Sequence, residues 1–144
     1  MIPKELQEIV EDIKRHEGFE PKVYECSEGY NTIGYGFAIK DLFFDKETSD
    51  FVLDKKIKGI LGGISADEDD WDTWFFKKPQ AVKEVLINMI YEIGFSGVKK
   101  FKKTIRYIKE DKLLLASEEM LDSKWARSDS PNRAKELSDI LKSQ

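Results

Sequence analysis

Hydrophobic residues at the start of the chain recur with the spacing of one face of an α-helix. The apolar positions of this face are Leu6, Ile9, Val10 and Ile13. Pro3 suits the first turn of a helix, and Gly18 is a natural stop. The pattern therefore predicts a helix over residues 3–16.

Between residues 22 and 39 the pattern changes to aromatic and β-branched residues on either side of a glycine turn. We predict strands over 22–26 and 31–39, joined by a turn at Ser27-Glu28-Gly29. This small antiparallel hairpin is the only sheet that the pattern indicates.

The rest of the chain has helical periodicity up to its end. An amphipathic segment is expected to close at Gly62-Gly63, and a capping box at Ser65-Ala66-Asp67-Glu68 to open a short helix. Pro79 starts the most apolar segment, which ends at Gly94, and Ser130-Pro131 opens the last helix. We therefore predict an α+β fold, mostly α, in which a β-hairpin is segregated from a helical bundle.

Composition narrows the classes of function without selecting one. The chain has 144 residues, with one cysteine and one histidine. One cysteine excludes an internal disulfide, and together these two residues cannot supply the three or four nitrogen and sulfur ligands of a usual zinc site. No apolar run approaches the ~20 residues of a membrane span, and the acidic start is unlike a signal peptide. We expect a globular protein with no metal site and no stable membrane insertion.

Charge is distributed unevenly along the sequence. Residues 1–78 carry a net charge of −7 and residues 79–144 a net charge of +3, which together give −4. Because a nucleic-acid-binding domain is usually basic as a whole, we expect no nucleic-acid partner. The basic stretch 99–112 is typical of a solvated helix face, although it could attract an anionic polymer.

Three residues near the predicted hairpin carry potential chemistry. Glu17 continues the apolar stripe of the first helix, where burial and the negative end of the helix dipole would both favour a proton donor. Alternatively, the helix ends at His16 and Glu17 is solvated. Cys26 ends the first predicted strand, and a lone cysteine is most often a small buried hydrophobe. Thr32, on the facing strand, is by itself only a good strand former.

Taken together, these residues resemble the catalytic set of the phage-type lysozymes of glycoside hydrolase family 24. In that family a Glu is followed after eight residues by Asp or Cys, and after five more by Thr. Glu17, Cys26 and Thr32 have this spacing. Three further sequence motifs resemble those of the family and occur in the same order: Glu28-Gly29-Tyr30-Asn31-Thr32-Ile33-Gly34-Tyr35-Gly36, Leu86-Ile87-Asn88-Met89 and Trp125…Pro131-Asn132-Arg133-Ala134.

The resemblance implies an endolysin that hydrolyses the β-1,4 bond between N-acetylmuramic acid and N-acetylglucosamine in peptidoglycan and so lyses the host cell. It implies that Glu17 is the general acid, and that Cys26 and Thr32 activate and position water. The substrate-binding residues that it implies by position are Ala38, Tyr91, Thr104 and Arg133. Cys26 could act on water as a base or attack the sugar as a nucleophile, and we favour water activation.

The resemblance also implies a lysozyme-like fold in one domain over residues 1–144. A small lobe would span roughly 18–62, a helical lobe roughly 1–17 and 63–144, and the active-site cleft would lie between them. The expected enzyme is a monomer without a cofactor, encoded by a phage or prophage. It would wait in the host cytoplasm until a holin lets it reach the cell wall in the periplasm, where it would be bacteriolytic.

Three alternatives use the same residues differently. A lytic transglycosylase cuts the same bond without water, so it needs the acid but not a water-holding Thr32. In a non-catalytic glycan-binding module Cys26 would mark a decayed active site, which the retention of Glu17, Thr32 and Arg133 argues against. A cysteine–histidine amidase would need Cys26 beside His16, although the pattern places one on a strand and the other on the outward side of a helix end.

Overall fold

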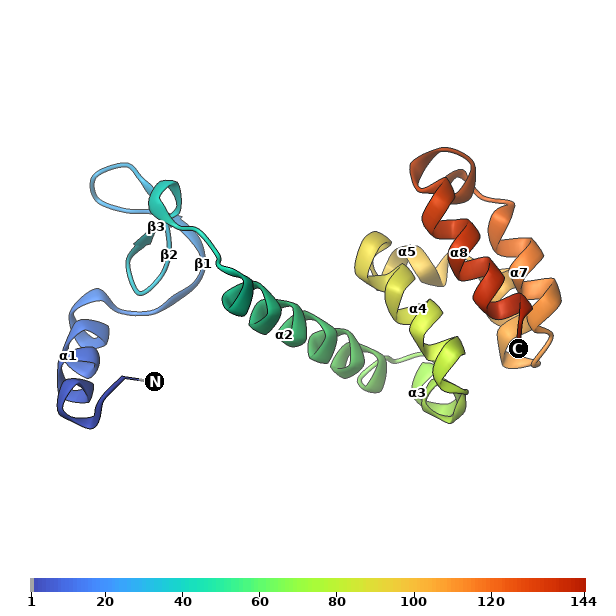
Figure 1. Cartoon of the computed structure of the whole chain (residues 1–144), viewed down its shortest axis with the longest axis horizontal. Helices are drawn as coiled ribbons and strands as arrows, with labels where there is room; N and C mark the ends of the chain where they lie inside the picture. The colour runs from blue at the N-terminus through green and yellow to red at the C-terminus, as the bar shows by residue number, and fades with distance from the viewer. Residues whose placement is uncertain (1) are drawn as a thin grey trace. The chain divides into compact units, whose positions relative to one another are not determined.

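The computed structural model describes residues 2–144, which divide into two compact units. One unit extends up to Ser49 and contains a helix and a small sheet, and the other, Asp50–Gln144, is helical (Figure 1). The predicted class, α+β and mostly α, is confirmed. The expected single domain, with residues 1–17 in the larger lobe, stays a prediction.

The first helix, α1 (Gln7–Glu17), ends where the sequence pattern places a stop. Gly18 adopts φ +69°, and its N–H donates to the carbonyl oxygen of Lys14 at 2.9 Å. The helix extends one residue beyond the predicted end and so includes Glu17. Its apolar face is exposed at Leu6, Ile9 and Ile13. Short 3-10 turns lie at Lys4–Leu6, Ile39–Asp41 and Phe75–Lys77.

The predicted hairpin is a three-stranded antiparallel sheet in the order β1-β2-β3. Its strands are β1 (Glu20–Glu25), β2 (Asn31–Gly34) and β3 (Phe37–Ala38). The single strand predicted over 31–39 is wrong, because the chain reverses at Tyr35-Gly36 and pairs with itself. Gly34 and Gly36 permit this reversal, since they adopt φ +69° and +74°, a region that favours glycine.

A long helix, α2 (Lys46–Ser65), follows the sheet. Asp45 caps it by accepting a hydrogen bond at 2.8 Å from the backbone N–H of Thr48, which lowers the pKa of the Asp45 carboxyl. The expected end at Gly62-Gly63 and the capping box at Ser65 are wrong, because α2 runs through both glycines to Ser65. A glycine inside a helix costs only about 1 kcal/mol relative to alanine, so it does not by itself end one.

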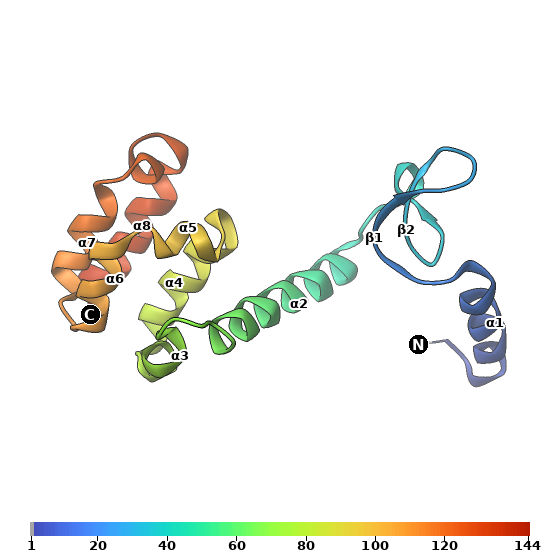
Figure 2. The same ribbon diagram turned by 180° about the vertical axis from the view of Figure 1, so that it is seen from behind.

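The helical unit contains the hydrophobic core of the chain. Its further helices are α3 (Trp71–Trp74), α4 (Gln80–Ile93), α5 (Phe95–Lys99), α6 (Lys102–Lys109), α7 (Leu113–Leu121) and α8 (Pro131–Lys142), with a π-helical turn at Trp125–Asp129. Figure 2 shows α6, α7 and α8 gathered beside α4, and α8 packs against both α7 and α4. The predicted start of α4 after Pro79, its end at Gly94 and the start of α8 after Ser130 are confirmed. Within residues 2–144, no helix combines the length and the apolar character that crossing a membrane requires.

Candidate active site

The carboxylate of Glu17 lies against the turn between β2 and β3. A Cβ atom built on Gly36 would overlap Glu17 Oε2 and would come within 3.0 Å of Glu17 Cδ. The approach is therefore possible because residue 36 has no side chain, and its φ of +74° also favours glycine. Glu17 is otherwise exposed, so its carboxyl group is open to a ligand.

Aromatic and cation–π contacts hold the end of α1 on this same turn. The rings of Phe19 and Tyr35 have centroids 5.3 Å apart, and Lys14 Nζ lies 5.8 Å from the centroid of Tyr35. Phe37, the first residue of β3, meets Tyr35 edge to face at 6.4 Å. These contacts help to fix Glu17 relative to the sheet.

Thr32 occupies the middle strand of the sheet and is 4% exposed. It pairs with Tyr24 on β1 and with Ala38 on β3. The structure therefore brings together two of the predicted site residues, Thr32 and the half-buried Ala38. Thr32 Oγ1 donates a hydrogen bond to the carbonyl oxygen of Tyr30 at 2.9 Å, which leaves its lone pairs available as acceptors.

Cys26 is half-buried and follows β1 directly. Its N–H donates to the carbonyl oxygen of Tyr30, and its carbonyl oxygen accepts from the N–H of Gly29, both at 2.9 Å. This tight turn directs the backbone N–H groups of Tyr30 and Glu28 toward the sulfur. They lower the pKa of the Cys26 thiol. The thiolate, which is the reactive form, is therefore favoured at this position.

In the helical unit, Arg133 is part of a hydrogen-bond network that the sequence analysis missed. Arg133 Nη1 donates to Glu92 Oε2 and Arg133 Nε to Asn88 Oδ1, both at 2.6 Å. Glu92 Oε1 accepts from Ser130 Oγ at 2.6 Å and from Trp125 Nε1 at 2.8 Å. These bonds, that of Ser130 foremost, hold the pKa of Glu92 below its usual range against the effect of burial.

A signal for this network was present in the sequence. Asn88 and Glu92 are four residues apart in the most apolar helix, so they lie on one face of it. A polar pair on one face of such a helix indicates a specific polar partner, because unpaired buried polar groups are costly.

Tyr91 and Arg133 line one pocket of the helical unit, with a volume of about 470 Å³. The other residues that line it are Leu53, Ile57, Glu84, Ile87, Asn88, Leu137 and Ile140. The structure therefore brings together two of the predicted substrate-binding residues. Tyr91 is 46% exposed, which leaves its ring available for stacking on a ligand.

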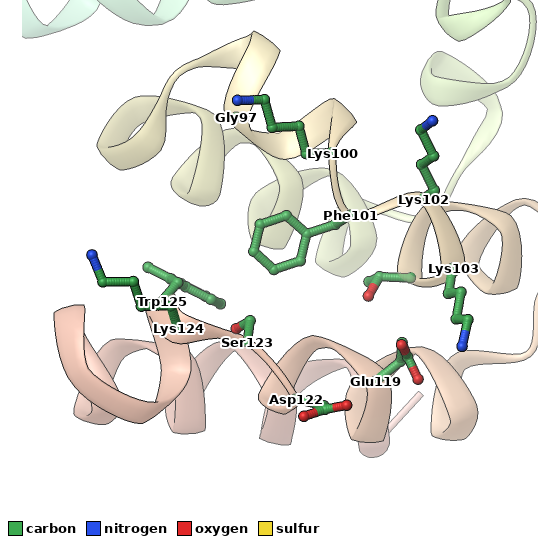
Figure 3. Close-up of a pocket in the computed structure, with 11 residues that line it drawn as sticks. Gly97, Lys100, Phe101, Lys102, Lys103, Glu119, Asp122, Ser123, Lys124 and Trp125 are labelled. Atoms are coloured by element: carbon green, nitrogen blue, oxygen red, sulfur yellow. The ribbon is translucent and has the colours of Figure 1, made fainter.

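Thr104 lies in a different pocket, also about 470 Å³, and is 2% exposed. Figure 3 shows the residues that line this pocket, among them Phe101 and Trp125. The rings of these two residues meet edge to face at 6.0 Å. The charged residues in its lining are Lys100, Lys102, Lys103, Lys124, Glu119 and Asp122. The structure therefore separates Thr104 from the pocket of Tyr91 and Arg133.

The structure gives less support to a catalytic role for His16. His16 Nδ1 donates to the carbonyl oxygen of Asp12 at 2.9 Å, which engages the imidazole within its own helix. In the part of the chain that the structure describes, no group of three or more His, Cys, Asp or Glu residues is arranged to hold a metal ion. What the smaller unit offers is a carboxyl group, a thiol and a hydroxyl, which is a set suited to proton transfer and to holding water.

Comparison with known proteins gives matches over nearly the whole chain. The family model described as phage lysozyme matches residues 14–139. "Probable T4-type lysozyme 1" of Dictyostelium discoideum is 25% identical over 162 aligned positions, which cover 94% of this chain and 94% of that protein. "Probable T4-type lysozyme 2" of the same organism is 25% identical over 162 positions, with 90% of each chain covered. The region matched by the family model includes Glu17, Cys26, Thr32 and Arg133.

Proposed function

Because this chain belongs to the phage lysozyme family, and is therefore a glycoside hydrolase of the muramidase class, we propose that it hydrolyses the β-1,4 bond between N-acetylmuramic acid and N-acetylglucosamine in peptidoglycan. The observation that carries the proposal is the position of Glu17 against Gly36, in the unit whose middle strand holds Thr32 beside Cys26. A carboxyl group is held there against the turn of the small sheet that also carries a hydroxyl able to bind water.

In this proposal Glu17 is the general acid. It donates its proton to the glycosidic oxygen as the bond from that oxygen to the anomeric carbon breaks and the sugar acquires oxocarbenium character. Two features support the role, since the carboxyl group is exposed and its position is restricted by the glycine turn behind it. A restricted acid loses less entropy on reaching the reactive geometry.

Thr32 and Cys26 would supply the attacking water. Because Thr32 donates its proton to Tyr30, its oxygen is left as an acceptor that can orient a water molecule. As the water oxygen bonds to the anomeric carbon, the water passes a proton to the thiolate of Cys26. The lowered pKa of this thiol supports its use as the base, because it increases the fraction of thiolate at any given pH.

The proposed substrate-binding residues are Ala38 in the smaller unit and Tyr91, Thr104 and Arg133 in the helical unit. Tyr91 and Arg133 contact the glycan from the pocket that they share, and Ala38 contributes a further contact. Thr104 lines a separate pocket and is almost fully buried. An exposed aromatic ring beside a guanidinium is suited to a sugar, because the ring covers an apolar face while the guanidinium donates to oxygen atoms.

The biological part of the proposal is that a phage or prophage encodes this enzyme as a monomeric endolysin. It would be held in the host cytoplasm and would depend on a holin to reach the wall. Expression in bacteria with and without a pore-forming holin tests this dependence. We expect culture lysis only when the holin is present, and lysis without it would contradict the dependence.

The reaction itself is tested by the mass of its products. Purified peptidoglycan is digested with the enzyme, and the fragments are analysed by mass spectrometry. Hydrolysis adds one water and leaves a reducing N-acetylmuramic acid. Anhydro-muropeptides would instead establish a lytic transglycosylase, and binding to peptidoglycan with no release of fragments would establish a glycan-binding module.

A further inference from the structure

Tyr30 closes the turn between β1 and β2, and its backbone contacts both polar side chains that would supply the water. Its carbonyl oxygen accepts one hydrogen bond from Thr32 Oγ1 and another from the backbone N–H of Cys26, both at 2.9 Å. Its own N–H is directed toward the sulfur of Cys26. The position of this one residue therefore sets the thiol and the hydroxyl relative to each other.

The backbone of this turn is bonded across its base, whereas the side chain of Tyr30 is not part of the sheet. The carbonyl oxygen of Cys26 accepts from the N–H of Gly29, which adopts φ +85°, and Glu25 pairs with Asn31 just outside the turn. The Tyr30 side chain is 45% exposed. A contact made by its ring is therefore needed to fix the residue from the other side.

Lys40 makes this contact. It lies in the 3-10 turn Ile39–Asp41, which follows β3 and packs against β2. Its Nζ lies 3.9 Å from the centroid of the Tyr30 ring, the shortest cation–π distance among the described residues. Within residues 2–144, Lys40 forms no ion pair, so no carboxylate competes for its ammonium group.

The state of the Cys26 thiol depends foremost on where the N–H of Tyr30 points. This N–H has the largest of the effects that lower the pKa of the thiol, and the N–H of Glu28 has the next largest. The carboxylate of Glu28 acts on the sulfur directly and opposes them. A shift of Tyr30 should therefore change the thiol even where no charged group near the sulfur moves.

From this arrangement we propose that Tyr30 is a positioning residue, which holds the Cys26 thiol and the Thr32 hydroxyl together through its backbone, and that Lys40 fixes Tyr30 by covering its ring. This inference rests on the proposed hydrolysis of peptidoglycan and specifies how the water-activating pair is kept in place. Neither Tyr30 nor Lys40 touches the reacting atoms.

The pH dependence of Cys26 alkylation by iodoacetamide tests the link without any substrate. Lys40→Met removes the cation and keeps a long side chain, and it should raise the midpoint by about half a pH unit, a size set by the strength of an exposed cation–π contact. Tyr30→Leu removes the ring and keeps Lys40, and it should raise the midpoint by a similar amount. Lys40→Arg places a cation over the ring again and should restore the wild-type midpoint.

The variant with both substitutions separates positioning from charge. It should match Tyr30→Leu, because Lys40 acts through the ring of Tyr30. A direct effect of the Lys40 charge on the thiol would instead raise the midpoint equally in both backgrounds. Lys22→Met is the matched control, since Lys22 is an exposed cation on β1 of the same sheet, and it should keep the wild-type midpoint.

Turnover of soluble uncrosslinked peptidoglycan strands extends the test to the reaction, with kcat and KM measured separately. Lys40→Met should lower kcat about threefold and leave KM within about twofold, because water is activated less well while glycan binding is unchanged. Lys40→Arg should restore kcat. The melting temperature of each variant shows which of them fold, and Lys40 is exposed, so its substitution should not prevent folding.

Each outcome decides for or against the positioning role. An unchanged midpoint in folded Lys40→Met, additive effects in the double variant, an equal rise in Lys22→Met, or a raised midpoint with unchanged kcat would overturn it. If the wild-type enzyme releases reducing sugars while these variants fail the test, only this inference is lost. If the wild type releases none, the proposed function is wrong, and the alkylation midpoints still decide whether Lys40 and Tyr30 hold Cys26.

Discussion

The carboxylate of Glu17 occupies the space into which any side chain at Gly36 would project its Cβ atom. The two residues are 19 positions apart in the sequence, at the end of α1 and in the turn between β2 and β3. The glycine therefore has two functions, because it permits the backbone turn and also makes room for the proposed acid. A substitution at Gly36 should affect the chemistry as well as the fold.

Gly36→Ala should reduce hydrolysis of peptidoglycan at least about tenfold, because the new methyl group displaces the Glu17 carboxylate. It should also lower the free energy of unfolding by about 1–2 kcal/mol, since alanine is strained at positive φ. Gly94→Ala is the matched control, because Gly94 has φ +80° and open space where its Cβ would lie. The control should lose similar stability and keep its activity. Equal activities of the two variants would contradict the contact.

Replacement of Cys26 should follow the chemistry of the group that replaces the thiol. Cys26→Asp should retain or raise activity, because the backbone N–H groups of Tyr30 and Glu28 can stabilise a carboxylate as they do the thiolate. Cys26→Ser should be poor and Cys26→Ala worse, since neither can take a proton from water at neutral pH. Turnover and melting temperature are measured together. An active Cys26→Ala with an unfolded Cys26→Asp would show instead that the cysteine is structural.

The pH dependence of Cys26 alkylation should reveal the hydrogen bonds around the sulfur. Because the folded protein lowers the pKa of this thiol, its alkylation rate should rise at a lower pH than in the urea-unfolded chain. Thr32→Val should cut hydrolysis about tenfold, because the acceptor that orients water is lost, whereas Thr32→Ser should not. Iodoacetamide labelling addresses this one site, since the chain has a single cysteine. Equal midpoints for the folded and the unfolded chain would contradict the assignment.

Lys99 should stabilise the helical unit through a mostly buried partner. It forms an ion pair with Asp67, whose side chain is 8% exposed, and a second with Asp69 at 3.1 Å. Lys99→Ala leaves the Asp67 carboxylate without its cation, so we expect a loss of about 2 kcal/mol in the free energy of unfolding. Lys135→Ala breaks the exposed pair with Asp139 and should change the free energy of unfolding very little. Urea denaturation measures both, and equal losses would contradict the prediction.

The ion pair of Lys99 with Asp67 should also make the stability of the protein depend on pH. Asp67, followed by Asp69, raises the pKa of Lys99 in the folded protein. The stabilisation is therefore fully present below the pKa of an unfolded lysine, and it is lost as the pH rises through the raised value. The difference in stability between the wild type and Lys99→Ala should accordingly shrink at strongly alkaline pH.

Local signals made much of the fold predictable. The end of α1, both ends of α4 and the start of α8 follow from glycine, proline and serine at the positions where helices begin and end. The turn at Tyr35-Gly36 could not be predicted, because one long strand and two strands joined by a turn show the same alternation of apolar and polar residues. The end of α2 was misplaced for a related reason, since two glycines weaken a helix without ending it.

The candidate site was likewise predictable only where its residues are close together in the sequence. The spacing of Glu17, Cys26 and Thr32 is local and was therefore visible in the sequence. The hydrogen-bond network of Glu92 was not, because its partners Trp125, Ser130 and Arg133 are 33, 38 and 41 positions away. Contacts at such separations depend on how helices pack, and no periodicity along a single helix records them.

The release of reducing sugars from purified peptidoglycan by Glu17→Gln tests the central claim most directly. Glutamine keeps the shape of Glu17 but has no transferable proton, so the rate should fall by about 10²–10⁴-fold while the melting temperature is unchanged. Glu8→Gln, on the exposed first turn of the same helix, is the matched control and should retain the wild-type rate. A folded Glu17→Gln enzyme within about threefold of the wild-type rate would contradict the account, because catalysis would not then depend on this carboxyl group.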